Sequence, residues 1–461
     1  MTGADPLTAE ILKARGITRL VYFHCDHFEP WRYVEGRPAD LALAVDDVER
    51  YIAASSTGFG ARATLFYKAN INFLVDGDRK LWRAHPADRL GFVPPSREAD
   101  GWSAAVLGAL SAAGRELQVH IHHENVTWND GIRDAAVRAY LATPENRRFD
   151  DARFELLVRL NLSLLARQAN FDRSRWFFVH GQWALNASDP HECTIVREIE
   201  ILRRNGCLGD FTQPAGRVHV DSRIDEPFLA RPVPLAKGYD RPEAEPAAAS
   251  GCGDVAEDRF FLWASRIDHR SCSIDHRAEF VVRRMADPTV FARAQAEAGF
   301  AHDGVLYVKT HAHSMDPFYW RDPAVADFPH VHPGIVRELG GLFDTAESCG
   351  IVVELATASE AFDRVTGAVP AADRDLVARY GLDKGDPMAL VGCDVVHADA
   401  DGPVPPPPLR SDPRPIGKMR PARTAMAEDP SVWPEIVAVA EPDRVRGGVG
   451  GWLSRLIGRA A

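Results

Sequence analysis

The chain is long enough to bury a large hydrophobic core, because it has 461 residues of which 46% are hydrophobic. Its formal net charge of −11 and its lack of a basic stripe argue against a protein that binds nucleic acid, since contacts to the phosphate backbone need clustered Lys and Arg. No run approaches the roughly 18 apolar residues that a membrane-spanning helix needs.

The seven cysteines are scattered and form no CxxC pair. This pattern argues against a disulfide framework and against a zinc knuckle. The first residues, MTGADPLTAEILKARGITRL, lack the basic start and the apolar stretch of a secretory signal. We therefore expect a cytoplasmic protein.

Apolar patterns with the period of a strand alternate with patterns that have the period of a helix. We expect strands within residues 17–31, 61–77, 116–128, 176–188, 258–267, 304–314 and 350–362. We expect helices at 8–15, 40–54, 101–114, 150–169, 195–206 and 333–349. Strands that alternate with helices predict a parallel α/β fold, and α/β barrels carry their active sites at the carboxyl ends of the strands.

The composition changes after about residue 395, where ADADGPVPPPPLRSDPRP is too rich in proline to form a helix. We expect an α/β domain over 1–370, an irregular Pro-rich extension over 371–450 and a short amphipathic helix over 451–461. That helix could lie weakly at the inner face of a membrane, or dock on its own domain or on a partner subunit.

One polar strand end lies in the segment Tyr22–His27. His24 and Asp26 are two residues apart, so they share a face of the expected strand, and Glu29 follows in the exit turn. A carboxylate with imidazoles suits zinc, iron, cobalt or manganese.

A second polar strand end lies in Leu117–Asn125. His120 and His122 share a face about 7 Å apart, so both can reach one metal ion; His120 with His123 is the alternative pair. We expect Asp26 to meet these histidines and to form, with His120 and His122, a site for one divalent metal, with zinc preferred over cobalt, manganese, iron or nickel.

Three further strand ends carry polar side chains. Lys309, His311 and His313 share a face, and the histidines there could act as general acid or as metal ligands, while the lysine could stabilise an oxyanion or bind a sugar substituent. His180 and Trp183 lie where a strand turns at Gly181; an aromatic ring beside hydrogen-bonding groups suits a sugar ring. Asp210 lies at another expected strand end.

The segments HCDHFEP, VHIHHENVTW and VKTHAHS, in this order, resemble the motifs of the polysaccharide deacetylase family. HGQWALNAS and GCLGDFTQP resemble a divergent branch, and the resemblance covers about residues 17–365. It implies a distorted (β/α)7 barrel, a divalent metal held by one Asp and two His, and hydrolysis of acetyl groups on sugars. The family has two adjacent aspartates in its first motif, whereas this chain has only Asp26, which leaves His24 or Glu29 as the base.

We therefore expect a metal-dependent hydrolase that removes an acyl group from a sugar or saccharide precursor. His24 or Glu29 would accept the proton of water, and His311 or His313 would protonate the leaving group. A substrate-binding set completes the expected site: His180, Trp183, Asp210 and Lys309. The alternatives are a metal-dependent glycosidase or amidohydrolase on a similar barrel, and an inactive protein that binds saccharides or scaffolds a polysaccharide-assembly system.

Overall fold

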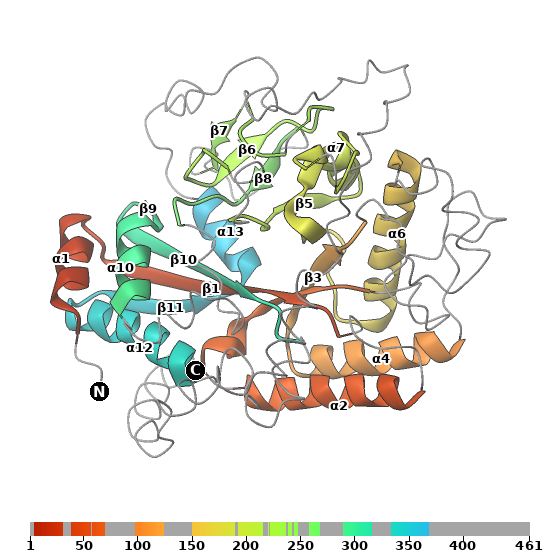
Figure 1. Ribbon diagram of the computed structural model, residues 1–461, viewed down its shortest axis with the longest axis horizontal. Helices are drawn as coiled ribbons and strands as arrows, with labels where there is room; N and C mark the ends of the chain where they lie inside the picture. The colour runs from red at the N-terminus through yellow and green to blue at the C-terminus, as the bar shows by residue number, and fades with distance from the viewer. Residues whose placement is uncertain are drawn as a thin grey trace, which may run out of the picture.

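The computed structural model of the chain has a mixed α/β fold around one large sheet (Figure 1). It describes residues 4–30, 38–56, 58–69, 97–123, 150–189, 192–214, 220, 222–236, 238–241, 244–247, 258–267, 289–315 and 333–367. The expected Pro-rich extension and the expected helix over 451–461 lie outside the described residues.

The structure contains the helices and strands that the apolar patterns predict, together with further elements such as the helices over 289–298 and 358–366. The strands are β1 (Arg19–Phe28), β2 (Thr64–Tyr67), β3 (Glu116–Ile121), β4 (Trp176–His180), β5 (Cys207–Asp210), β6 (Phe228–Ala230), β7 (Glu245–Pro246), β8 (Phe260–Leu262), β9 (Phe300–His302), β10 (Val305–Ala312) and β11 (Val352–Ala356). The α-helices are α1 (Pro6–Ala14), α2 (Pro38–Ala54), α4 (Arg97–Ala112), α6 (Asp151–Gln168), α7 (Glu198–Arg204), α10 (Thr289–Ala298), α12 (Pro333–Ser348) and α13 (Ala358–Thr366). Short 3-10 helices are η1 (Gly58–Arg62), η3 (Gly181–Trp183) and η4 (Leu185–Ala187).

The centre of the sheet is parallel. Neighbouring strands follow the order β10, β1, β2, β3, β4, β5 and β8, and each pair in this series is parallel. β11 also pairs in parallel with β1, whereas β9, β6 and β7 add antiparallel pairs at the two ends. Because the central strands run in one direction, their carboxyl ends lie along one edge of the sheet.

The sheet is strongly curved. Trp263, directly after β8, contacts Tyr307 of β10 with ring centroids 6.4 Å apart, although five strands stand between β8 and β10 in the sheet order. We call the face that carries Phe23, Phe66 and Phe177 the inner face, because their rings belong to one apolar cluster that the curved sheet surrounds. A closed (β/α)7 barrel stays a prediction.

Helices cover the other face, which we call the outer face. Near β1 and β10 it is packed by α1, α10 and α12, which contribute Leu12, Phe291 and Phe343 to a buried cluster. Near β2 to β5 it is packed by α2, α4, α6 and α7. Figure 1 shows α2 and α4 side by side below this part of the sheet. The strands of a sheet buried on both faces read as nearly continuous apolar runs, as β4 and β8 do.

The expected strands within the described residues are confirmed, usually with tighter bounds, except that residues 358–362 of the expected strand 350–362 belong to α13. The expected end of a helix at Gly206 is also confirmed: α7 ends at Arg204, and Gly206 has a φ of 90°, which favours glycine. The sequence patterns do not predict β6, β7 and β9, which are two or three residues long.

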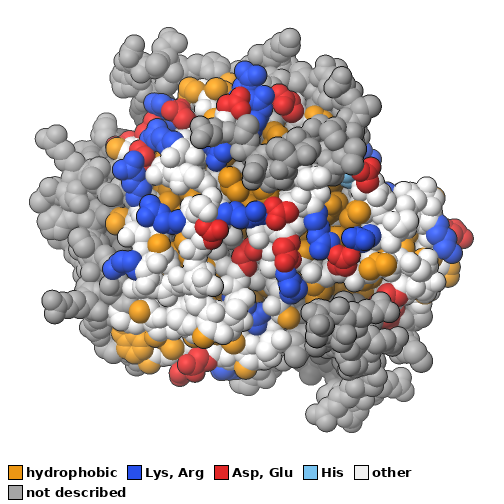
Figure 2. Space-filling view, turned by 180° about the vertical axis from the view of Figure 1, so that it is seen from behind, with side chains coloured by type: hydrophobic (Ala, Val, Ile, Leu, Met, Phe, Trp, Pro, Cys, Tyr) orange, Lys and Arg blue, Asp and Glu red, His pale blue; other side chains and the backbone are white. Residues whose placement is uncertain are grey.

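Charges of both signs alternate on the surface in Figure 2, where Lys and Arg side chains lie among Asp and Glu side chains. Ion pairs such as Arg62–Glu360, Arg175–Asp363 and Arg204–Glu155 join several of them. Within the described residues no helix combines the length and the apolar composition needed to cross a membrane.

Candidate metal centre

Histidines gather at the carboxyl ends of β1, β3 and β10. His27 lies near the end of β1, His120 near the end of β3, and His311 near the end of β10. Strand register explains the gathering, because Cys25 pairs with His311 across parallel strands, and paired residues point to the same face. The inner face at this edge therefore carries a group of imidazoles.

Glu29, His120 and His122 form the tightest group of donor atoms there, and we call them the Glu29 cluster. Glu29 Oε1 lies 3.0 Å from His120 Nε2 and 2.7 Å from His122 Nε2. The two Nε2 atoms are 3.0 Å apart. Three donor atoms thus converge on one point, and the cluster could hold a metal ion.

A backbone contact orients His120 for such a role. Its Nδ1 lies 2.8 Å from the carbonyl oxygen of Val179 and donates to it, so Nε2 presents its lone pair to the cluster. Burial lowers the pKa of His120 to about 4, although the nearby carboxylate of Glu29 acts in the opposite direction. The imidazole is therefore neutral at physiological pH, which is the form that binds metals.

His122 is the most exposed residue of the Glu29 cluster. Its side chain is 14% exposed, whereas those of His120 and Glu29 are 0% and 2% exposed. Gly181 makes room for His122, because a Cβ at position 181 would lie 2.6 Å from Cγ of that ring. His122 is thus the partly exposed member of a cluster that is otherwise buried.

His27 faces the cluster from β1. Its ring centroid lies 5.1 Å from that of His120, 5.7 Å from that of His311 and 4.8 Å from that of His313. Burial, and then the nearby charges of His313 and His120, lower the pKa of His27 well below its usual value. Its Nε2 is buried and has no hydrogen-bond partner among the described residues.

Asp26, the expected carboxylate ligand, lies on the outer face. It pairs in register with Ala312, which belongs to the cluster under α12. Its carboxylate accepts hydrogen bonds from the Ser314 amide at 3.2 Å and from the Ser314 hydroxyl, and it lies 3.3 Å from His24 Nε2. Glu29, and not Asp26, is the carboxylate in the group that includes His120 and His122.

His24, expected as a base, accompanies Asp26 on the outer face. Its Nδ1 lies 2.8 Å from Thr310 Oγ1, which in turn is 2.8 Å from the hydroxyl of Tyr22. The expectation that His24 and Asp26 share a face is confirmed by their contact. The face itself is the one that packs against helices.

Comparisons with protein-family models, curated proteins and solved structures return no match for this chain.

The expected substrate-binding residues separate into different environments. Lys309 is buried on the inner face and donates to the carbonyl of Gln213 at 2.9 Å. Asp210 is buried and accepts hydrogen bonds from the amide and hydroxyl of Thr212, at 2.9 and 2.7 Å. Burial raises the pKa of Asp210 to about 6. Trp183 is half-buried at the end of η3, with a φ of 61°.

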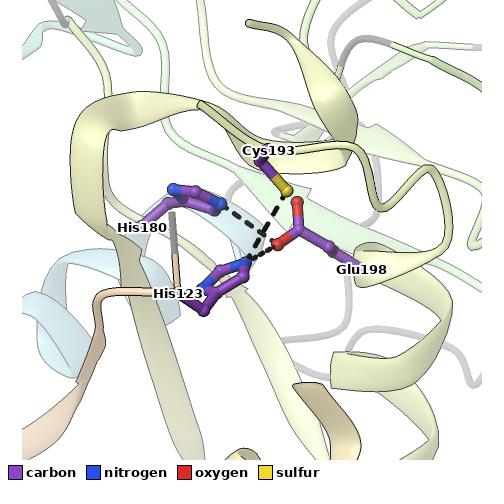
Figure 3. A group of neighbouring side chains, drawn as sticks. All are labelled: His123, His180, Cys193 and Glu198. Atoms are coloured by element: carbon purple, nitrogen blue, oxygen red, sulfur yellow. Dashed lines mark hydrogen bonds and ion pairs between the residues drawn. The ribbon is translucent and has the colours of Figure 1, made fainter. Parts of the chain in front are cut away.

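His180 belongs to a second group of donor atoms on the outer face (Figure 3). We call this group, which comprises His123, His180, Cys193 and Glu198, the Cys193 cluster. All four residues are at most 1% exposed, and this cluster too could hold a metal ion. Sequence reasoning missed Cys193 and Glu198, because they lie in a turn and at the start of α7, not at a strand end.

Proposed function

We propose that this chain is a metal-dependent hydrolase whose catalytic ion is held by Glu29, His120 and His122. One observation carries the proposal: three donor atoms converge at the carboxyl edge of the sheet, and three further imidazoles stand beside them. A catalytic zinc site is typically built from three protein ligands and keeps one position open. Two imidazoles and one carboxylate meet that description.

The residues of the Glu29 cluster fit a divalent ion. Two imidazole nitrogens and one carboxylate oxygen lie within about 3 Å of one another, and a cation at their common point would interact with all three. The hydrogen bond from His120 to Val179 fixes the ring that presents its nitrogen. When bound, a divalent ion would supply Lewis-acid activation of an acyl carbonyl and of water.

We assign the two proton transfers, from water and to the leaving group, to two neighbouring histidines. His27 is buried and neutral, so its Nε2 is suited to accept a proton from the attacking water. His313 is partly exposed beside it, and is suited to deliver a proton to the leaving group. His311 is buried, and its ring centroid lies 5.7 Å from that of His27. In this scheme His27 takes the role that the sequence patterns assign to His24 or Glu29.

We propose an acylated sugar or saccharide as the substrate. The support is the order of the motifs HCDHFEP, VHIHHENVTW and VKTHAHS, which resembles that of polysaccharide deacetylases. The half-buried ring of Trp183 could stack on a sugar, because it follows the strand that carries His180. Zinc is the ion that we propose first, since it accepts mixed nitrogen and oxygen ligands.

The test is a product assay on the full chain with N- and O-acetylated oligosaccharides. The chelated protein is reloaded with zinc, cobalt or manganese, and acetate and new reducing ends are measured separately. We expect acetate without reducing ends, and activity only after reloading. Reducing ends without acetate would replace the proposal by a glycosidase, and metal-loaded protein that releases neither product would refute the hydrolase.

Two matched carboxylate variants locate the ion. Glu29→Gln removes a donor of the cluster, and we expect it to lower activity by at least about 100-fold and to abolish binding of the catalytic ion. Asp26→Asn changes a carboxylate three residues away on the outer face, and we expect the catalytic ion to remain bound. If Asp26→Asn loses the ion and Glu29→Gln keeps it, the ligand assignment is wrong.

A further inference from the structure

We infer that the Cys193 cluster is a second metal site, closed and structural, that binds zinc. This inference is independent of the proposed function, because it concerns other residues on the other face of the sheet. Its donors are two imidazoles, one thiolate and one carboxylate, all within 4.8 Å of one another. Four protein ligands that include a cysteine are typical of a structural zinc site.

Two separations in the cluster are close to those around a tetrahedral ion. Cys193 Sγ lies 3.8 Å from His123 Nε2, and His180 Nε2 lies 3.1 Å from Glu198 Oε1. Zinc bonds of 2.0 to 2.3 Å at tetrahedral angles set donor separations of roughly 3.3 to 3.6 Å. His123 Nε2 also contacts the same Glu198 oxygen. Figure 3 shows the four side chains pointing toward one common centre.

Contacts behind the donors aim them at that centre. The amide of Asn186 donates to the second carboxylate oxygen of Glu198, so Oε1 is the oxygen turned inward. Nδ1 of His180 donates to the carbonyl of Gly181, its closest partner, and leaves Nε2 for an ion. In the other tautomer, Nδ1 would instead accept a hydrogen bond from the Ala184 backbone amide, whose nitrogen lies 3.2 Å away. Backbone groups that orient a ligand in this way are a regular part of metal sites.

A catalytic triad would need a different arrangement. In a Cys–His–Glu triad the thiol and the carboxylate contact opposite nitrogens of the imidazole, because one nitrogen accepts the thiol proton while the carboxylate orients the ring through the other. Here Cys193 Sγ and Glu198 Oε1 both lie against Nε2 of His123. Cys193 is also 1% exposed, which closes it to a substrate. Three donor atoms that lie beside one another in this way are arranged like ligands of one ion.

A buried ion pair of Glu198 with His123 and His180 is the remaining alternative. Burial alone would raise the pKa of Glu198, but the two histidines lower it to about 2, so the carboxylate is ionised. Such a pair explains the three nitrogen and oxygen donors. The thiol of Cys193 accepts a hydrogen bond from the Ile195 backbone amide at 3.4 Å, and a metal ion would add to this contact by using the sulfur, 3.8 Å from His123 Nε2, as a fourth ligand.

A closed site here would hold the Glu29 cluster in place. His123 follows His122 in the chain, and the two residues contribute to the two clusters on opposite faces. Gly181 contributes its carbonyl to His180, and its Cα lies against the ring of His122. An ion in the Cys193 cluster would therefore tie the ends of β3 and β4 to the start of α7.

The experiment uses cobalt as a spectroscopic probe of the full-length protein. We expect metal-free protein to bind two cobalt ions per chain, and one of them to give the near-ultraviolet charge-transfer band of a cobalt–thiolate bond. Cys193→Ser should remove this band and one bound ion. Cys207→Ser is the matched control, because Cys207 is a buried cysteine outside the cluster on β5; it should keep the band and both ions.

The outcomes separate this inference from the proposed function. The Glu29 cluster contains no sulfur, so Glu29→Gln should lose one ion and keep the band. A folded wild-type protein, verified by circular dichroism, that binds cobalt without the band overturns the second site and leaves the catalytic proposal standing. If Cys193→Ser fails to fold, Glu198→Gln replaces it, and an unchanged stoichiometry and band in that variant would also overturn the inference.

Discussion

The imidazole rings of His27 and His120 face each other with centroids 5.1 Å apart, across the strand β2 that separates β1 from β3 in the sheet. This relationship makes His27 a β1 residue that faces the Glu29 cluster. Asp26 precedes it in the chain and points the other way, toward α12 and its neighbours.

His27→Gln should lower kcat by about 100-fold or more, because it removes a proton acceptor beside the reacting water. Metal content should not change, since His27 is not among the three converging donors. His24→Gln is the control: it alters an imidazole on the other face and should change kcat little. Steady-state kinetics and metal analysis of both variants check this. Loss of the ion in His27→Gln would instead make His27 a ligand.

Gly181→Ala should weaken binding at the Glu29 cluster without removing any donor atom. The added Cβ would come within 2.6 Å of Cγ of His122 and push the ring out of place, and misplaced ligands typically cost 10- to 100-fold in affinity, roughly as removal of a supporting contact does. Gly108→Ala on α4 is the control, because an added Cβ there meets nothing within 4 Å. Competition with a chromophoric chelator measures the difference. Equal affinities in the two variants would contradict the close contact.

Ser314→Ala should destabilise the fold and leave catalysis intact. Ser314 donates to Asp26 through both its amide and its hydroxyl, and a buried carboxylate that loses a donor typically costs about 1–3 kcal/mol in the free energy of unfolding. Urea unfolding of the variant measures this loss, and kcat of the folded protein should stay near the wild-type value. A large fall in kcat at unchanged stability would indicate that Asp26 takes part in catalysis.

The contribution of Asp210 to the free energy of unfolding should fall as the pH rises. Burial raises its pKa from 3.8 to about 6, so the folded state holds the Asp210 proton more tightly than the unfolded state. Its contribution is therefore most favourable below about pH 4 and is lost as the pH rises to about 6, by roughly 3 kcal/mol at most. Asp210→Asn should remove this dependence. The unfolding midpoints of the wild type and of Asp210→Asn are measured between these pH values. If the midpoints of the two proteins change with pH in parallel, the prediction is wrong.

The order and type of most elements could be predicted from the sequence, because long apolar patterns specify β1, β3, β10 and α12. Strand alternation also predicts correctly that His120 and His122 share a face. Alternation cannot say which of the two faces of β1 meets the histidines of β3 and β10. That choice depends on the register of β1 against β10, which places Cys25 beside His311.

The Cys193 cluster shows a different limit of sequence reasoning. Cys193 and Glu198 come within reach of His123 through a turn and a short helix, at 70 and 75 positions along the chain. No periodic pattern links positions so far apart. Only the pairing of Ile121 with His180 brings the two histidines to one place.

The strand end from His120 to His123 tolerates no change in length. Consecutive residues there serve opposite faces, with His122 in one cluster and His123 in the other. A deletion or insertion of one residue between Gln118 and His122 would exchange the faces and place each imidazole against the wrong partners. Two-residue changes would restore the faces but move both rings by about 7 Å along the strand. Natural or designed variants of this chain should therefore vary in length elsewhere and keep this segment constant.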